Sequence, residues 1–208
     1  MDGTNTRFAE ETRAERERLA SIFDAFGPEQ WDADSLCEGW SAKEVLAHMT
    51  MPYRLSALRF LGGMLRARFR FDRFADRDAR AVARARNGRE LTELYQANVD
   101  HPWRPPGGGP AGALSHEVVH GLDITEPLGL PAPPPERIAL AFAATGPRNL
   151  KYFGVDLTGA RLVAEDAELT VGKGEPHHML AKDVLLVATG RLLLADVGRG
   201  SGRHEERT

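Results

Sequence analysis

The amino-acid sequence predicts an α+β protein in which a bundle of helices is followed by a small α/β domain. Apolar residues recur at helical spacing through most of the first 153 residues. Beyond Gly154, short alternating segments separated by glycines replace this pattern, and such segments are typical of strands. We therefore expect a bundle over residues 1–153, a small α/β domain over residues 154–198 and a disordered tail over residues 199–208.

Two long helices are expected at the start of the bundle. Residues 6–26 place apolar side chains among many charges, and a Gly-Pro pair then ends the pattern. After a polar loop, Ser41 is followed three residues later by Glu44, which is the capping box that opens a helix. Pro52 lacks a backbone N–H donor, so we expect this second helix to bend there.

Arginine is concentrated in residues 66–89, which contain nine arginines and three aspartates with phenylalanines between them. This mixture could serve nucleic acid binding. Because the whole chain carries a net charge of −3, we favour a solvated crossover between helices, in which some arginines could attract a small anionic substrate.

The remaining elements follow from the same criteria. Further helices are expected at about 88–99, 113–125, 136–152 and 178–189. Residues 101–112 are so rich in proline and glycine that they predict a loop. A hairpin is expected within residues 156–175, and a last short strand over residues 191–197.

Composition limits the class of protein. The 42% hydrophobic and 27% charged residues are ordinary for a globular chain. No apolar run approaches the length that spans a bilayer, and the N-terminus lacks the apolar core of a signal peptide. We therefore expect a cytoplasmic protein with neither a membrane nor a nucleic-acid partner. The single cysteine, Cys37, excludes an internal disulfide framework and an all-thiolate metal site.

Two histidines stand four residues apart in the segment SHEVVHGLDITEPLGL. On a helix, His116 and His120 project from one face, which is the spacing of a metal-binding pair or of two half-buried histidines that hydrogen-bond separately. His48 lies on another long helix, and a bundle can aim facing side chains into its interior. These three histidines would form a site with one position open, which is typical of reactive zinc.

Two stretches, SLCEGWSAKEVLAHMT and HEVVHGLDITEPLGL, resemble the signature segments of the mycothiol-dependent maleylpyruvate isomerase family. The N-terminal part of that family is a DinB-like four-helix bundle. The later stretches ARLVAEDAELTVGKGEP and AKDVLLVATGR resemble its small C-terminal α/β domain. The resemblance covers most of the chain in the right order.

The resemblance implies a divalent metal, with zinc first and nickel or iron as other choices. The family's ligands are a histidine on the second helix and an E-x-x-x-H pair, which His48 and His120 match. Position 116 matches the glutamate but is histidine here, so the metal would be more positive. Glu117 is an alternative ligand, three residues before His120. Asp123 could accept the outer N–H of a ligand histidine, or it could be an ordinary helix-end residue.

The resemblance also implies an activity. Mycothiol would bind the metal as a thiolate and attack a small electrophilic, anionic substrate, as an isomerase or an S-transferase. Arg191, in the segment ATGR, would hold a substrate carboxylate, although an arginine there could merely complement a helix end. Cys37 is expected to be structural. Two other functions stay open, a thiol-independent metallo-hydrolase and a non-enzymatic metal- or ligand-binding bundle. No pattern in the sequence predicts the oligomeric state.

Overall fold

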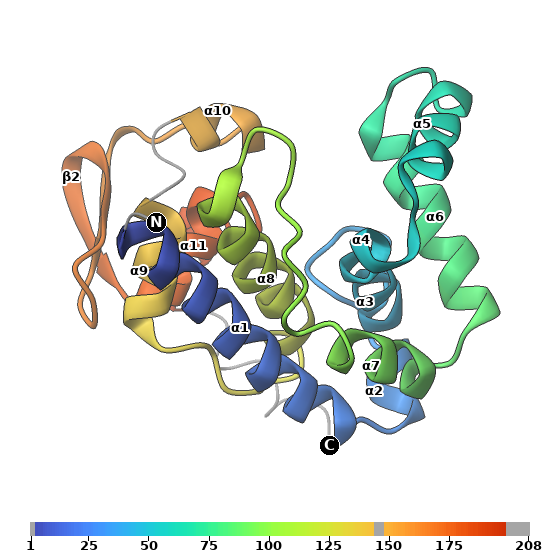
Figure 1. Cartoon of the computed structure of the whole chain (residues 1–208). Helices are drawn as coiled ribbons and strands as arrows, with labels where there is room; N and C mark the ends of the chain where they lie inside the picture. The colour runs from blue at the N-terminus through green and yellow to red at the C-terminus, as the bar shows by residue number, and fades with distance from the viewer. Residues whose placement is uncertain (1–2, 144–147, 199–208) are drawn as a thin grey trace. The chain divides into compact units, whose positions relative to one another are not determined.

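The computed structural model describes residues 3–143 and 148–198. These residues confirm the predicted α+β class, because a helical N-terminal part is followed by a small part with two strands (Figure 1). The chain divides into two compact units, Met1–Ala132 and Pro133–Thr208.

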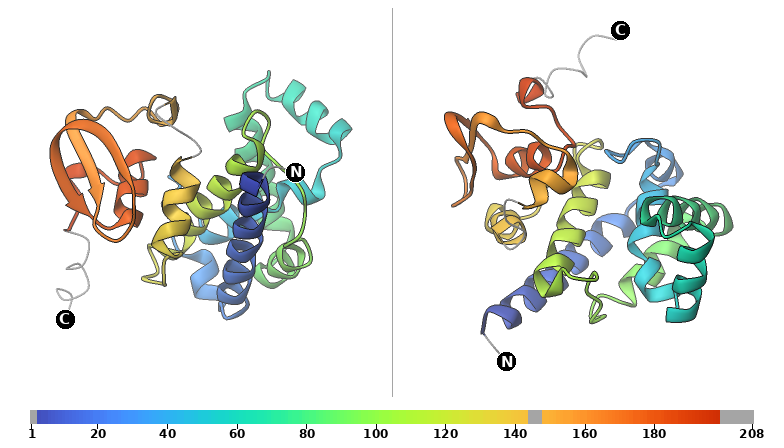
Figure 2. Two further views of the ribbon diagram at one scale, coloured as in Figure 1. Left: turned by 60° about the vertical axis from the view of Figure 1, so that its left-hand side comes forward. Right: turned by 90° about the horizontal axis from the view of Figure 1, so that it is seen from above.

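The first unit is helical. Its elements are α1 (Gly3–Asp24), α2 (Pro28–Asp32), α3 (Ala42–Met49), α4 (Met51–Arg54), α5 (Ala57–Arg66), α6 (Phe71–Ala85), α7 (Gly88–Gln96) and α8 (Gly109–Thr125). α1 lies beside α8, and α3 packs on α6, α7 and α8. Figures 1 and 2 both show α5 at the outer end of this unit, far from α1.

The predicted start of the second long helix is confirmed. The Ser41 hydroxyl accepts the backbone N–H of Glu44 at 3.4 Å, and the Glu44 carboxylate accepts the backbone N–H of Ser41 at 2.9 Å. The expected interruption near Pro52 is also present, because α3 ends at Met49 and α4 begins at Met51. Together these two signals place His48 in the last turn of α3.

The expected solvated crossover over residues 66–89 is wrong for its central part, which forms the regular helix α6. Alanines spaced four residues apart give α6 a narrow face that can pack closely, and the arginines project from its other sides. The buried members of this face are Ala75, Ala79 and Ala83. The number of arginines conceals the alanine spacing in the sequence.

α8 begins earlier than expected. Its first residue, Gly109, lies inside the predicted loop of residues 101–112. Pro110 occupies the first turn, where a missing backbone N–H removes no helical hydrogen bond. The helix therefore gains one turn before the histidine pair.

The core of the first unit lies where α1, α3, α7 and α8 meet. It includes the fully or almost fully buried side chains of Leu19, Phe23, Leu46, Tyr95 and Ile124. Phe23 packs at ring-centroid distances of 5.7 Å from Trp31 and 5.8 Å from Tyr95. This core joins the helix that carries His48 to the helix that carries the histidine pair.

The second unit combines helices with a short sheet. Its elements are α9 (Pro135–Ala143), α10 (Arg148–Phe153), β1 (Thr158–Ala164), β2 (Thr170–Met179), α11 (Ala181–Ala188) and a 3₁₀ turn (Leu194–Asp196). β1 pairs with β2 in parallel, from Thr158 with Lys173 to Ala164 with Met179. The register shifts at residues 161–163, which also have partners in residues 170–172. α11 packs on both strands and on α9.

Several expectations for this unit need correction. The helix expected over residues 136–152 is seen as α9 and α10, with residues 144–147 outside the described part of the chain. The expected hairpin is a mainly parallel pair, and α11 starts late because β2 continues to Met179. The expected strand over residues 191–197 contains a 3₁₀ turn instead, since consecutive leucines do not alternate with polar residues as a half-buried strand requires.

The expected domain boundary after residue 153 stays a prediction. The packing places α9 with α11, because the two helices contact each other within the second unit. The expected disordered tail over residues 199–208 lies outside the described residues.

Candidate metal centre

Three histidines from two helices meet in the first unit. His48 comes from the last turn of α3, and His116 and His120 come from successive turns of α8. The ring centroids are 4.8 Å apart for His116 and His120, 4.9 Å for His48 and His120, and 5.5 Å for His48 and His116. One possible ligand nitrogen from each ring lies within 4.8 Å of the other two. The structure thus brings together the three histidines that the spacing suggested.

The chemistry of these rings fits a metal ion. The Nδ1 atoms of His48 and His116 are buried, and neither has a hydrogen-bond partner within the described part of the chain. A buried ring nitrogen without a partner is costly unless another group satisfies it. Burial, followed by the neighbouring His120 and His116, lowers the pKa of His48 well below its ordinary value. His48 is therefore neutral near pH 7, which is the form that binds a metal.

Asp123 holds the third ring in place. Its Oδ2 atom lies 2.9 Å from Nδ1 of His120, and the carboxylate is fully buried. A carboxylate on one nitrogen fixes the ring and leaves Nε2 available to a metal. The Cys37 thiol also donates to Oδ2 of Asp123, at 3.0 Å, and the Leu36 backbone N–H donates to the Asp123 carbonyl at 2.9 Å. Sequence reasoning missed the contact between the Cys37 thiol and the Asp123 carboxylate.

A second group of possible ligands shares His120. One donor atom from each of Cys37, His120 and Asp123 also lies within 4.8 Å of the others. Their hydrogen bonds to one another already use the thiol, the carboxylate and Nδ1 of His120. The set of three histidines is the better candidate, because it contains buried nitrogens that no hydrogen bond satisfies.

Glu117, the alternative ligand that the sequence suggested, forms hydrogen bonds with residues outside the histidine cluster. It is fully buried, and its carboxylate accepts Nε of Arg16 at 3.0 Å and the Tyr95 hydroxyl at 2.7 Å. Nδ1 of His116 is 3.7 Å from its Oε1 atom. Burial would raise the pKa of Glu117, but His116, Arg16 and Tyr95 together hold it at about 2. The ionised carboxylate ties α8 to α1 and α7.

Arg16 is a further residue that sequence reasoning missed. It lies on the apolar face of α1, in register with Thr12, Leu19 and Phe23, and it is 2% exposed. Its Nη1 atom donates to the backbone carbonyl of His101 at 2.8 Å. A charged residue in the apolar register of a helix is the signal that could have revealed this buried ion pair.

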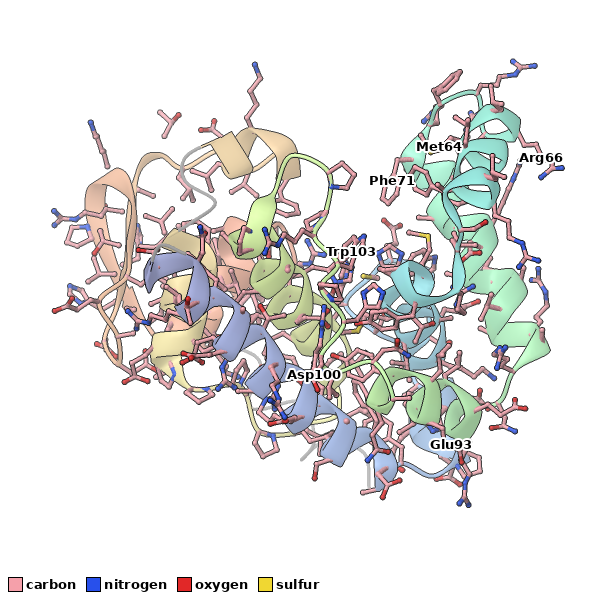
Figure 3. All side chains as sticks on the ribbon, viewed as in Figure 1. Met64, Arg66, Phe71, Glu93, Asp100 and Trp103 are labelled. Atoms are coloured by element: carbon pink, nitrogen blue, oxygen red, sulfur yellow. The ribbon has the colours of Figure 1, made fainter. Side chains whose placement is uncertain are left out.

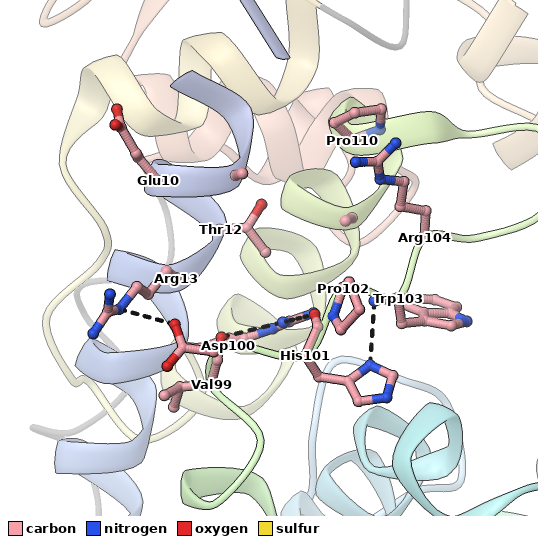
Figure 4. A pocket seen from close by; sticks show the side chains of 13 residues that line it. Glu10, Thr12, Arg13, Val99, Asp100, His101, Pro102, Trp103, Arg104 and Pro110 are labelled. Carbon is pink, nitrogen blue, oxygen red and sulfur yellow. Dashed lines mark hydrogen bonds and ion pairs between the residues drawn. The ribbon is translucent and has the colours of Figure 1, made fainter. Parts of the chain in front are cut away.

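A cavity of about 310 Å³ lies between α1 and the loop that precedes α8 (Figure 4). Its wall includes Thr12, Arg13 and Arg16 of α1 and His101, Trp103 and Arg104 of the loop between α7 and α8. Trp103, which Figures 3 and 4 label, also meets His116 edge to face at 5.1 Å between ring centroids. The indole therefore forms part of the cavity and touches the candidate metal centre.

Arg191 belongs to the second unit. Gly190, with φ of 73°, follows the end of α11, and the next residue turns its side chain back toward that helix. Nη1 of Arg191 donates to the Thr189 carbonyl at 2.9 Å, and Cζ lies 5.3 Å from the centroid of the Phe153 ring. These contacts fit the helix-end alternative, and a role of Arg191 toward substrate stays a prediction.

Comparisons with known proteins give a family. No curated protein and no solved structure matches the chain. A family model described as the mycothiol maleylpyruvate isomerase N-terminal domain matches residues 12–125, which is more than half of the 208 residues. The matched segment contains His48, His116 and His120. The chain therefore belongs to the mycothiol maleylpyruvate isomerase family.

Proposed function

We propose that this protein is a metal- and mycothiol-dependent enzyme that acts on a small, electrophilic, anionic substrate. The observation that carries the proposal is the cluster of three imidazoles, two of which have a buried nitrogen without a hydrogen-bond partner in the described residues. His48, His116 and His120 would hold a divalent metal, with zinc as the first choice and nickel or iron as others. A metal held there supplies a Lewis acid that converts a bound thiol to its thiolate at neutral pH.

The surrounding residues prepare this site. Asp123 fixes the ring of His120, and Cys37 and the Leu36 backbone hold Asp123 in turn. All three proposed ligands are neutral imidazoles, so no ligand charge offsets the metal. The Glu117 carboxylate is not a ligand in this proposal, because its hydrogen bonds go to Arg16 and Tyr95. This arrangement favours a strongly acidic metal centre and hence a reactive thiol.

The cavity next to Trp103 is the proposed place for the body of the thiol or of the substrate. Its volume of about 310 Å³ is at the lower end of the range for small-molecule sites. Arg104 at its wall is exposed and adds a positive charge. We further propose that Arg191 binds a substrate carboxylate, since a guanidinium can grip a carboxylate through two parallel hydrogen bonds.

Two reactions share the same first step, in which the thiol sulfur forms a bond to an electrophilic carbon of the substrate. In an isomerisation, the former double bond rotates as a single bond, and the same carbon–sulfur bond then breaks to release the thiol. In an S-transfer, the carbon–sulfur bond remains, and either a leaving group departs with its electron pair or the neighbouring carbon takes up a proton. The products therefore distinguish an isomerase from an S-transferase.

Metal analysis combined with turnover assays tests the proposal. The full chain, purified without added metal, should contain one metal ion, and His48→Ala, His116→Ala and His120→Ala should each lose it. Turnover of maleylpyruvate, or of a thiol-reactive electrophile, should require both the metal and mycothiol. Turnover that needs the metal but no thiol would replace this proposal with a metallo-hydrolase. Bound metal without turnover of any electrophile would indicate a binding protein.

A further inference from the structure

The first unit exposes large apolar side chains in one short segment. Among the described residues, seven large hydrophobic side chains are exposed, and five of them lie within residues 58–71. These five are Leu58, Leu61, Leu65, Phe69 and Phe71. Leu58, at 83% exposure, is the most exposed of the seven. Such a concentration marks an interaction surface, because scattered single exposures are the ordinary case.

The leucines form a stripe on α5 that the fold does not use. Leu58, Leu61 and Leu65 are spaced by three and four residues and so share one side of the helix. A different side, which carries Phe60 and Met64, packs on the cluster around Phe74. α5 packs on the rest of the unit through this inner side, so the exposed leucine stripe does not contribute to that packing.

The turn after α5 adds two phenylalanines to this surface. Arg68 and Phe69 adopt φ angles of 54° and 56°, a left-handed conformation that is costly for residues other than glycine. Phe69 stays 66% exposed in this turn, and Phe71 begins α6. Figure 3 labels Phe71 and Arg66, whose side chains project from this end of the unit.

The same segment is strongly basic. Residues 57–73 contain the five exposed arginines 59, 66, 68, 70 and 73, and Asp72 is their one acidic residue. Five positive charges and one negative charge give a local charge of +4, in a chain whose net charge is −3. Asp72 lies 3.1 Å from Arg70 in an exposed pair. The segment therefore combines apolar side chains with a positive field.

We propose that the α5 face, defined as the five exposed apolar side chains and the five arginines of residues 57–73, docks on the surface of an anionic lipid bilayer. The leucine stripe would enter the boundary between headgroups and acyl chains, and the arginines would contact lipid phosphates. Within the described residues no helix is long and apolar enough to cross a membrane. The sequence predicted no membrane partner because it contains no apolar run long enough to span a bilayer. A helix that lies on the membrane surface needs no such run.

Two other partners fit this face less well. A single-stranded nucleic acid could stack on Phe69 and Phe71, but it would leave the three exposed leucines of the α5 stripe without an apolar partner. A second copy of the chain, joined about a two-fold axis, would bring one local charge of +4 against another. An anionic bilayer satisfies both the apolar stripe and the arginines.

Cosedimentation of the full chain with vesicles tests the proposal. The protein should bind vesicles of phosphatidylcholine that contain phosphatidylglycerol, and it should not bind pure phosphatidylcholine. Raised salt should weaken the binding, because the arginine contribution is screened. Leu61→Trp should show a blue shift of tryptophan emission on these vesicles, whereas Leu193→Trp, at a 71% exposed position outside the face, should not.

Variants of the face separate its two components. The triple variant Leu58→Ser, Leu61→Ser, Leu65→Ser should weaken vesicle binding by at least about tenfold, because three apolar side chains are removed. The double variant Arg59→Glu, Arg66→Glu should also weaken it by at least about tenfold. The control variants Leu193→Ser and Arg89→Glu alter exposed residues outside the face and should bind as the parent does.

Three results would overturn the proposal. One is a failure of the parent to bind anionic vesicles, and another is binding that the face variants do not change. The third is a different partner for the face, shown by anisotropy of a labelled oligonucleotide or by self-association in sedimentation velocity that the leucine variant abolishes without any vesicle binding. Metal content and thiol-dependent turnover are measured separately, so this proposal and the proposed function can fail independently.

Discussion

Replacing Glu117 with glutamine should destabilise the first unit by about 3–5 kcal/mol, because it leaves the guanidinium of Arg16 buried without its charge partner. The side chains of this pair are 2% and 1% exposed, so water cannot replace the lost carboxylate. Glutamine keeps the shape but offers one carbonyl oxygen where the carboxylate accepts both Arg16 and Tyr95. With stabilities of ordinary domains near 5–15 kcal/mol, the variant should stay folded but melt roughly 6–20 °C lower.

The matched control is Glu93→Gln on α7. Glu93 makes an ion pair of 3.1 Å with Arg89, almost as short as the 3.0 Å of the buried pair, but its side chain is 64% exposed. This control should change the unfolding free energy by less than about 1 kcal/mol. Urea unfolding followed by far-UV circular dichroism measures both variants. Equal effects of the two substitutions would refute the argument that burial sets the strength of the Arg16 pair.

The same variant decides whether Glu117 is a metal ligand. Glu117 faces Arg16 and Tyr95, and so Glu117→Gln should retain the metal content of the parent while it lowers the stability. Loss of metal with unchanged stability would contradict both statements. In that case Glu117 and His120 would be the working pair of α8, and His116 would be an ordinary helix residue.

Four further predictions follow from the same contacts. His116→Glu should retain metal by elemental analysis, because a carboxylate is an acceptable zinc ligand. It should raise the pH at which thiol-dependent activity reaches half its maximum, since the site becomes less positive by one charge. A pH midpoint that stays or falls would show that His116 is not a ligand. Cys37→Ala should lower metal affinity by about tenfold in a chelator competition, because Asp123 loses the thiol donor, and Cys37→Ser should keep most of it. Equal affinity of Cys37→Ala and the parent would leave Cys37 as a packing residue. Arg191→Ala should raise KM for anionic substrates without changing the metal content, and unchanged kinetics would leave only its contact at the helix end. Removal of the metal by a chelator should lower the melting temperature, by an amount equivalent to about 2.7 kcal/mol when free metal had been at one hundred times Kd; if the melting temperature does not move, the histidines hold no metal in the folded state.

Local signals predicted the parts of the site that neighbouring residues determine. The capping box at Ser41 and the interruption before Pro52 set the limits of α3, and these limits decide where His48 lies. The spacing of His116 and His120 placed both rings on one face of α8. Each of these predictions needed only residues within two helical turns of one another.

Contacts between distant parts of the chain were beyond reach. Arg16 and Glu117 are separated by 101 positions, and Cys37 and Asp123 by 86. No spacing rule joins such residues, because the packing of α1 and of the loop before α3 against α8 brings them together. The prediction for the arginine-rich segment was wrong for another reason. α6 packs through small alanines, which contribute little to a hydrophobicity pattern.

The residues that support the three histidines come from separate elements, and this distribution links metal binding to folding. α3 supplies His48, the loop before α3 holds Asp123 behind His120 through Cys37, and α1 and α7 hold Glu117 beside His116. In an unfolded chain, His116 and His120 are still close because they are neighbours in sequence. His48 is not held near them, and the supporting contacts are absent. A metal that needs all three imidazoles therefore binds the folded unit in preference to the unfolded chain and stabilises it by mass action. A defect in the contacts of Asp123, which lies behind the proposed ligand His120, should therefore appear both as weaker metal binding and as a smaller gain in stability when metal is added.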